Sequence, residues 1–331
     1  HPYPSRSCIP MKAFFASLAL LASLSLAAPT LADTFGTGAN TFSVDFVTIG
    51  DPGNSGDLTG SPYNGGAVAY EYRIGKYEIS EDAIDKANAL SALEGNPLGI
   101  THDGRGANKP ATSISWFEAA RFVNWLNTST GGMPAYKFDI NGDFQLWEPG
   151  DAGYDPNNRY RNSQAQYVLP SAHEWYKAAY FDPVTDTYFD YPTGSDTVPD
   201  GIDFVGDPVF DAVYRDPDAN AQPNDISNVG VLSPFGTAGQ GGNVFEWLET
   251  AFDLVNDLPG KQRGLRGGGW TSTSSVLQAL NSGIGTLPAF TSDKAGFRVL
   301  HIPEPSSLAL TAFGALSLAG VRRSGRRGCH L

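Results

Sequence analysis

Few side chains in this sequence could act as nucleophiles, bases or soft-metal ligands. The two cysteines, Cys8 and Cys329, lie near opposite ends of the chain, and neither has the spacing of a metal site. Of the five histidines, only His102 and His173 lie well inside the chain. Ser272 follows a glycine-rich stretch, but a serine nucleophile needs a neighbouring base, and no histidine is near it in sequence. The residues themselves therefore offer little for thiolate or serine chemistry.

Three motifs near the C-terminal end hold the remaining candidates: GGNVFEWLET over 241–250, RGLRGGGWTSTSS over 263–275 and GFRVL over 296–300. Glu246, like Glu174 earlier in the chain, could be a buried carboxylate that accepts backbone N–H bonds or binds a cation. Arg298 could tie the last strand inward through a charge-assisted hydrogen bond.

The elements that must position these side chains can be predicted from local patterns. Alternating apolar and polar residues predict strands over residues 42–49 and within 67–80. Three helices are expected to begin after an N-capping serine: Ser80, Ser115 and Ser171. Residues 182–233 are dominated by Asp, Asn, Pro and Gly and are predicted to be irregular. Such a long irregular region needs internal support, and a bound calcium ion is one means of providing it.

Composition limits the class of protein. The 331 residues are 41% hydrophobic, enough for a full core, and the length allows one large domain or two ordinary ones. A formal net charge of -13 argues against nucleic acid or an anionic membrane as a partner, because both need clustered Lys and Arg. Abundant Gly and Pro, with many aromatic residues, predict a loop-rich fold and not a helical bundle.

Both ends of the chain have the composition of targeting signals. Residues 11–32 combine a basic start, an apolar run and small residues, which predicts a secretory signal cut before Asp33. Residues 1–10 are expected to be an artefact or an upstream extension. At the other end, residues 302–327 contain an apolar run too short for an independent span, followed by an arginine cluster.

The C-terminal segment opens with Pro303, Glu304 and Pro305, and it resembles the PEP-CTERM sorting tail of exported bacterial proteins. An exosortase recognises and removes such tails, so the resemblance implies export and transient membrane anchoring. It also implies a final place in the cell envelope, at the outer surface or in the extracellular matrix of a bacterium. An uncleaved tail anchor is the alternative.

Five motifs in order, SISWFEAARFVNWLN, YVLPSAHEWYKAA, GGNVFEWLE, RGGGW and GFRV, resemble the formylglycine-generating enzyme (sulfatase-modifying factor) family over residues 33–301. The resemblance implies an α+β, elaborated C-type-lectin-like fold that is loop-rich and has little regular secondary structure. The motif residues expected to support that fold are Trp116, Trp175, Asn243, Trp247, Arg266 and Arg298.

The same resemblance implies that the family's chemistry is missing. The family oxidises a cysteine of a client sulfatase with copper held by two thiolates, whose positions correspond here to Ser272 and Leu277. The family's active-site serine corresponds to Gly269. Soft Cu(I) needs thiolate ligands, so no copper is expected. The three-histidine iron site of ergothioneine-synthase relatives is not expected either, because only two histidines lie inside the chain.

Calcium is a separate expectation from the resemblance. In the family, the loop around the glutamate binds a cation through main-chain carbonyls and the Glu side chain, which correspond to Gly242, Val244 and Glu246. A further Asn or Asp ligand corresponds to Gly239 and is absent. Another oxygen or a water could complete the six to eight ligands that calcium takes.

Two functional hypotheses remain. The first is a binding or structural module at the cell surface, which would use the Ser-, Thr- and Asn-rich residues 271–293 to bind a glycan or an envelope protein. The second is a divergent sulfatase-modifying oxidoreductase, or another enzyme on this scaffold. A closed apolar plug around Ser272 and Leu277 would favour binding, whereas an open polar cleft would favour catalysis.

Overall fold

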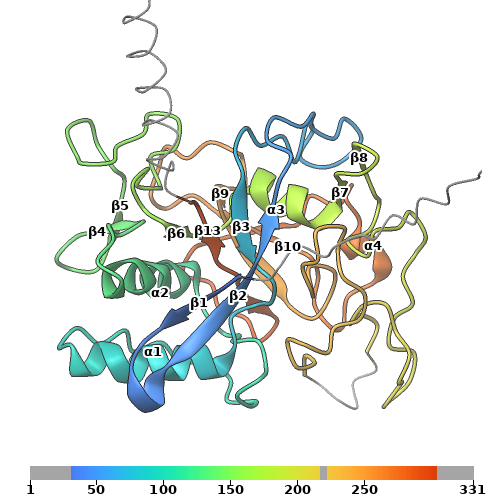
Figure 1. Cartoon of the computed structure of the whole chain (residues 1–331), viewed down its shortest axis with the longest axis horizontal. Helices are drawn as coiled ribbons and strands as arrows, with labels where there is room; N and C mark the ends of the chain where they lie inside the picture. The colour runs from blue at the N-terminus through green and yellow to red at the C-terminus, as the bar shows by residue number, and fades with distance from the viewer. Residues whose placement is uncertain (1–30, 217–221, 304–331) are drawn as a thin grey trace, which may run out of the picture.

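Two sheets form the framework of the computed structural model, which describes residues 31–216 and 222–303 (Figure 1). The larger sheet is antiparallel throughout, in the order β1-β2-β3-β13-β6. Its strands are β1 (Leu31–Phe35), β2 (Phe42–Ile49), β3 (Tyr72–Gly75), β13 (Leu300–His301) and β6 (Tyr167–Val168). The chain therefore closes this sheet by bringing its last described strand between β3 and β6.

The second sheet carries most of the motif residues. Its order is β11-β10-β9-β12, in which β12 is parallel to β9 and the other pairs are antiparallel. The strands are β9 (Phe245–Ala251), β10 (Arg263–Arg266), β11 (Ile284–Thr286) and β12 (Ala295–Gly296). Two small hairpins, β4 (Lys137–Phe138) with β5 (Phe144–Gln145) and β7 (Phe181–Asp182) with β8 (Thr187–Tyr188), complete the strands.

The three predicted helices form, and each begins after its expected serine. They are α1 (Glu81–Leu93), α2 (Trp116–Ser129) and α3 (Ala172–Tyr180), and the short helices η1 (Gly38–Asn40) and α4 (Ser274–Leu277) are additional. Ser115 and Ser171 both form full capping boxes, with Glu118 and Glu174 respectively, which satisfy N–H groups that a helix start leaves unpaired. Helix α1 packs on β2 and α2, α2 on β6, and α3 on β9.

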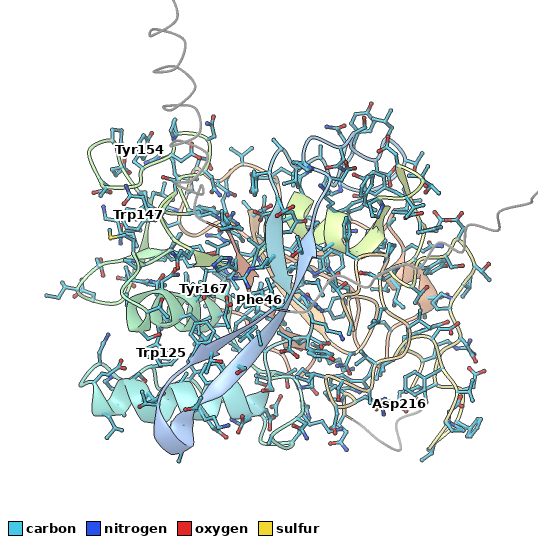
Figure 2. All side chains as sticks on the ribbon, viewed as in Figure 1. Phe46, Trp125, Trp147, Tyr154, Tyr167 and Asp216 are labelled. Carbon is cyan, nitrogen blue, oxygen red and sulfur yellow. The ribbon has the colours of Figure 1, made fainter. Side chains whose placement is uncertain are left out.

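The main core is built largely from side chains of β2, α1 and α2. The predicted apolar face of α2 is fully buried there, including Trp116 and Val123. Figure 2 shows Phe46, Trp125 and Tyr167 gathered in this region, with Asp216 on the opposite side of the molecule. Stacked and edge-to-face aromatic pairs connect these elements, as aromatic anchors do in a loop-rich fold.

Regular structure is sparse, with 16% helix and 21% strand, so the expected α+β, loop-rich class is confirmed. Within residues 182–233, backbone hydrogen bonds supply internal support. The Asn243 N–H donates to Val213 O at 2.7 Å, and the Arg215 N–H donates to Ser272 O at 3.0 Å. These bonds hold the irregular region against the glycine-rich motifs and order it through the main chain.

The two targeting predictions fall mostly outside the described residues. Most of residues 11–32, together with Glu304 and Pro305, lie there, whereas Pro303 is exposed just after β13. Leu31 and Ala32 belong to β1, and the Asp33 carboxylate forms a salt bridge of 2.7 Å with Arg73. Within the described residues, no helix is both long and apolar enough to cross a membrane.

Candidate functional site

Ser272 lies in a tight turn that occupies its hydroxyl. The Gly269 N–H donates to Ser272 Oγ at 3.0 Å, and the Ser272 N–H donates back to Gly269 O at 2.9 Å. No cluster of three or more His, Cys, Asp or Glu side chains that could hold a metal occurs among residues 31–216 and 222–303. The hydroxyl thus serves the local turn, and no base positioned to activate it contacts it in the described chain.

Leu277, at the end of α4, fills the second of the two positions. Its side chain is completely buried in an apolar cluster with Tyr191, Ala212 and Tyr214. The packing is close, since a Cβ added at Gly268 would lie 3.0 Å from Leu277 Cδ1, and Gly268 has a φ of +84°. The geometry is therefore the closed apolar plug and not an open polar cleft.

Neither inner histidine serves this region through a direct contact in the structure. His102 Nε2 lies 3.0 Å from Asp85 Oδ1, and His102 Nδ1 lies 3.4 Å from Glu81 Oε1. Both carboxylates belong to α1. His173 Nδ1 is buried without a hydrogen-bond partner, and burial lowers the pKa of its imidazole. His102 contacts carboxylates of α1, and His173 belongs to α3.

A buried ion pair joins the motifs GGNVFEWLET and GFRVL. Arg298 binds both oxygens of Glu246, each at 2.5 Å, and neither side chain is exposed. The Trp175 indole N–H donates to Glu246 Oε2 at 2.7 Å. Arg298 also donates to the carbonyls of Gly75 at 2.8 Å and Ala238 at 2.9 Å, which ties the last strand to β3. This bidentate geometry is the strong form of an arginine–carboxylate contact.

The other motif residues are packing and hydrogen-bonding anchors. The indole N–H of Trp116 donates to Leu248 O at 3.0 Å, and that of Trp247 donates to Ile114 O at 2.8 Å. These two reciprocal bonds lock α2 onto β9. Asn243 adopts a positive φ of 57°, which Asn tolerates better than most residues, and its amide donates to Glu78 Oε1 at 2.9 Å.

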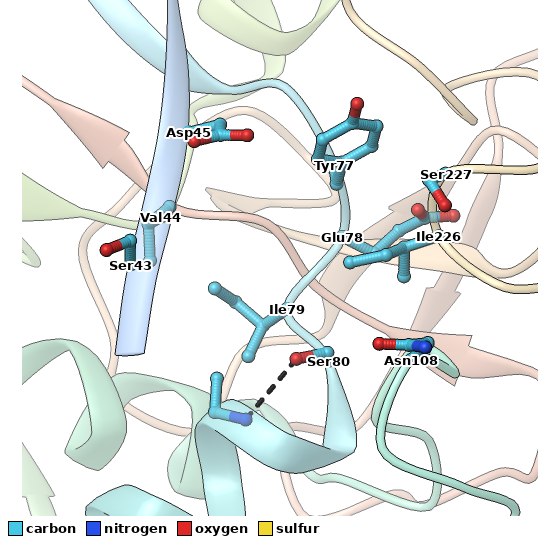
Figure 3. A pocket seen from close by; sticks show the side chains of 11 residues that line it. Ser43, Val44, Asp45, Tyr77, Glu78, Ile79, Ser80, Asn108, Ile226 and Ser227 are labelled. Atoms are coloured by element: carbon cyan, nitrogen blue, oxygen red, sulfur yellow. Dashed lines mark hydrogen bonds between the residues drawn. The ribbon is translucent and has the colours of Figure 1, made fainter. Parts of the chain in front are cut away.

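Glu78 was not predicted as a site residue, yet it lies beside Asn243 and near both Glu246 and Arg298. It is 2% exposed, and its Oε2 has no hydrogen-bond partner in the described structure. Burial raises the pKa of Glu78, and nearby Glu246 adds to the rise, although Arg298 opposes it. Glu78 lines a cavity of about 240 Å³, and Figure 3 shows it beside Ile226, with Asp45 of β2 on the opposite side.

The predicted calcium ligands, Gly242, Val244 and Glu246, lie in the same part of the molecule as Glu78. Gly242 and Val244 flank Asn243, but the Glu246 carboxylate is already bound by a cation, Arg298. Gly239 lacks a side-chain ligand, and a Cβ there would lie 2.8 Å from Glu78 Oε1. As arranged, these residues do not fit a calcium ion, because Glu246 would first have to leave Arg298. The calcium site stays a prediction.

Chelation tests the calcium prediction directly. We expect EDTA to leave the melting temperature unchanged, because the one predicted carboxylate ligand already has a buried counter-charge. Calcium present at 100 times its dissociation constant would instead stabilise the fold by about 2.7 kcal/mol. A drop in melting temperature with EDTA that excess calcium reverses would show that Arg298 yields to the ion.

A second buried charge network was also missed. Arg161 forms salt bridges with Glu174 at 2.9 Å and with Glu249 at 2.7 Å, and all three side chains are nearly or completely buried. The available signal was the pair of glutamates inside the otherwise apolar strand FEWLETA, since buried carboxylates need partners. The identity of the partner could not be read from local sequence.

Comparisons with known proteins bear on the family and the fold. A family model described as a sulfatase-modifying factor enzyme 1-like domain matches residues 60–302. The solved structure of CarF is 20% identical, covers 79% of this chain and 99% of its own, and has a TM-score of 0.55. Treponema denticola variable protein 1 is 17% identical, with 83% and 100% coverage and a TM-score of 0.55. None of the curated proteins matches this sequence.

Proposed function

Because the chain belongs to the sulfatase-modifying factor enzyme 1-like domain family, we propose that it is a member that has lost the copper chemistry and acts as an exported ligand-binding module. The two solved structures support the fold alone, since both are under 25% identical. The observation that carries the proposal is the burial of Leu277 in a closed apolar cluster at a thiolate position.

Copper does not fit the residues present. Cu(I) prefers soft sulfur ligands, whereas Ser272 offers a hydroxyl that the Gly269 N–H already binds, and Leu277 offers only carbon. The polar groups in the cluster around Leu277 are the hydroxyls of Tyr191 and Tyr214, which are bonded to Gln278 and to Pro199 O and are hard oxygen donors that do not suit Cu(I). No oxidation step can therefore be assigned to these side chains.

The segment after the glycine-rich motif supports a role in binding. Thr271, Thr273 and Ser275 are exposed; the hydroxyls of Thr273 and Ser275 lie 2.9 Å apart, and Lys294 donates to the hydroxyl of Thr271 at 2.8 Å. Leu280 and Leu287, further along, are 67% and 59% exposed. Exposed hydroxyls beside exposed apolar side chains suit a glycan or an envelope protein, which need both hydrogen bonds and apolar contact.

Processing at both ends is compatible with an intact domain. A cut before Asp33 would keep the Asp33 carboxylate, which binds Arg73 and accepts a hydrogen bond of 2.9 Å from Tyr167. At the other end the last sheet contact, from the Ile302 N–H to Gln166 O, comes just before Pro303. We therefore propose an exosortase as the processing partner, and the bacterial envelope or its exterior as the final location.

A copper and activity assay tests the catalytic half of the proposal. We expect the purified protein, given copper, oxygen and a cysteine-containing sulfatase peptide, to retain no stoichiometric Cu(I) and to form no aldehyde. The matched variant is Ser272→Cys with Leu277→Cys, which restores a thiolate pair and should gain Cu(I). Aldehyde formation by the unchanged chain, measured by mass spectrometry, would overturn the proposal. Binding to glycans and envelope fractions, with and without calcium, tests the other half.

A further inference from the structure

A second cavity, of about 400 Å³, has a lining that includes neither Ser272 nor Leu277, so it is separate from the copper positions. It is bounded by the start of α3 at Ala172, by Leu248 and Thr250 of β9, and by Gly264 and Arg266 of β10. Figure 1 shows α3, β9 and β10 side by side in this part of the molecule. The size is within the range of small-ligand pockets.

Arg266 lines this cavity as a buried cation with only neutral partners. Its residue is 3% exposed, and its guanidinium donates to the carbonyl oxygens of Ser61 and, at 3.4 Å, Ala279. Its guanidinium also lies 5.2 Å from the centre of the Tyr176 ring and 5.5 Å from that of the Trp175 ring. In the described chain no carboxylate lies within ion-pair distance of it. At least two of its five N–H donors therefore remain for a ligand.

Two of the three other buried arginines in the described chain have carboxylate partners. Arg298 is paired with Glu246, and Arg161 with Glu174 and Glu249. Arg263 also lacks a carboxylate partner, and its guanidinium lies 3.9 Å from the centre of the Tyr160 ring, but unlike Arg266 it does not line this cavity. A buried charge normally needs a counter-charge, so the unpaired Arg266 at a cavity favours an anionic ligand.

The mouth of the same cavity is apolar. Tyr63, Phe252 and Leu254 line it and are 73%, 41% and 47% exposed. Ala172, at the start of α3, also lines the cavity. A ligand that satisfied both the mouth and Arg266 would have an apolar body and one anionic group.

We propose that this cavity binds a carboxylate carried on an apolar body, with the carboxylate on Arg266 and the body against Phe252 and Leu254. A free aromatic or aliphatic acid and the C-terminal carboxylate of a peptide ending in an apolar residue share this chemistry. Ser282, within residues 271–293, also lines the cavity, but the residues assigned to the ligand here, Arg266, Phe252 and Leu254, lie outside that segment.

Calorimetric titration of the full chain with four probes tests the assignment. The probes are 3-phenylpropanoate, its neutral amide, a tripeptide ending in phenylalanine and the same tripeptide amidated. We expect at least one acid to bind about tenfold or more tightly than its amide, since only the acid pairs with Arg266. Preference for the tripeptide acid would identify a peptide terminus, and preference for 3-phenylpropanoate a free acid.

A substitution at the exposed mouth of the cavity tests the proposal without removing the buried Arg266. Leu254 has a φ of +65°, a conformation that Asp adopts more readily, so Leu254→Asp should fold and should repel the carboxylate. We expect it to weaken binding about tenfold or more, whereas Leu232→Asp, at a residue that is 42% exposed and outside the cavity lining, should not change it. Equal binding of acids and amides, no binding of either acid at millimolar concentration, or no effect of Leu254→Asp would overturn the proposal.

Discussion

Replacing Arg298 by methionine is expected to destabilise the fold by about 3–5 kcal/mol, the usual cost of breaking a buried ion pair from one side. The change leaves the Glu246 carboxylate in a fully buried place with only the Trp175 N–H to bind it. It also removes the donors to the carbonyls of Gly75 and Ala238, which no longer tie the last strand to the rest of the sheet.

Denaturant unfolding at neutral pH measures this loss of stability. Two further variants serve as controls. Arg159→Met removes a salt bridge to Glu148 whose side chains are 29% and 55% exposed, so it should cost at most about 1 kcal/mol. Arg298→Met combined with Glu246→Leu should be less damaging than Arg298→Met alone, because it also removes the stranded charge. If Arg298→Met and Arg159→Met lowered the free energy of unfolding by similar amounts, the buried Glu246 carboxylate would not need Arg298 for its stability.

Local signals predicted the helices well because each helix start is determined within four residues. Ser80, Ser115 and Ser171 all cap as expected, and the two capping boxes need only a glutamate three residues later. The strand over residues 42–49 is confirmed as β2, whose alternation of buried and exposed residues is a local property.

The buried charges could not be paired from sequence because their partners are far apart in the chain. Glu78 meets Asn243 across 165 positions, and Arg161 meets Glu249 across 88. The sequence showed that Arg298 and Glu246 should be structural, but nothing local indicated that they bind each other. Such pairs form because the whole fold places β9, which carries Glu246 and Glu249, beside segments that are distant in the chain.

The plug at Leu277 illustrates the same limit. A leucine at that position already excluded a thiolate ligand, but an open cleft remained conceivable. What closes the region is the irregular stretch that brings Tyr191, Ala212 and Tyr214 against it. That stretch lacks a periodic pattern, so its path could be known only from the structure. The loss of copper ligands and the closure of the region are therefore two separate observations that favour the same conclusion.

The second large effect concerns acid sensitivity at Arg161. This side chain binds Glu174 through two nitrogens, both at 2.9 Å, and Glu249 at 2.7 Å. Tyr70 donates to Glu174 at 2.6 Å and Tyr136 donates to Glu249 at 2.8 Å, so a tyrosine hydroxyl is bonded to each carboxylate. Nearly all of this network is shielded from water, which makes its stability depend strongly on protonation.

The direction of that dependence follows from Glu174. Burial raises the pKa of this carboxyl group, but the charge and hydrogen bonds of Arg161 outweigh burial and lower it to about 2. A pKa below the ordinary value of 4.5 means that the ionised form favours folding. Its contribution, on the order of 3 kcal/mol, is complete above about pH 5 and is lost as pH falls toward 2.

Arg161→Met should reverse this dependence. Without the guanidinium, burial is left to raise the pKa of Glu174, so protonation then favours the folded state. The variant should lose about 3–5 kcal/mol at pH 7 and recover part of it as pH falls from 7 to 5, where the unchanged protein stays level. Denaturant midpoints across this range measure both curves, with Arg159→Met as the exposed control that should follow the unchanged protein. Parallel curves for Arg161→Met and the unchanged protein would mean that Arg161 does not set the charge state of Glu174.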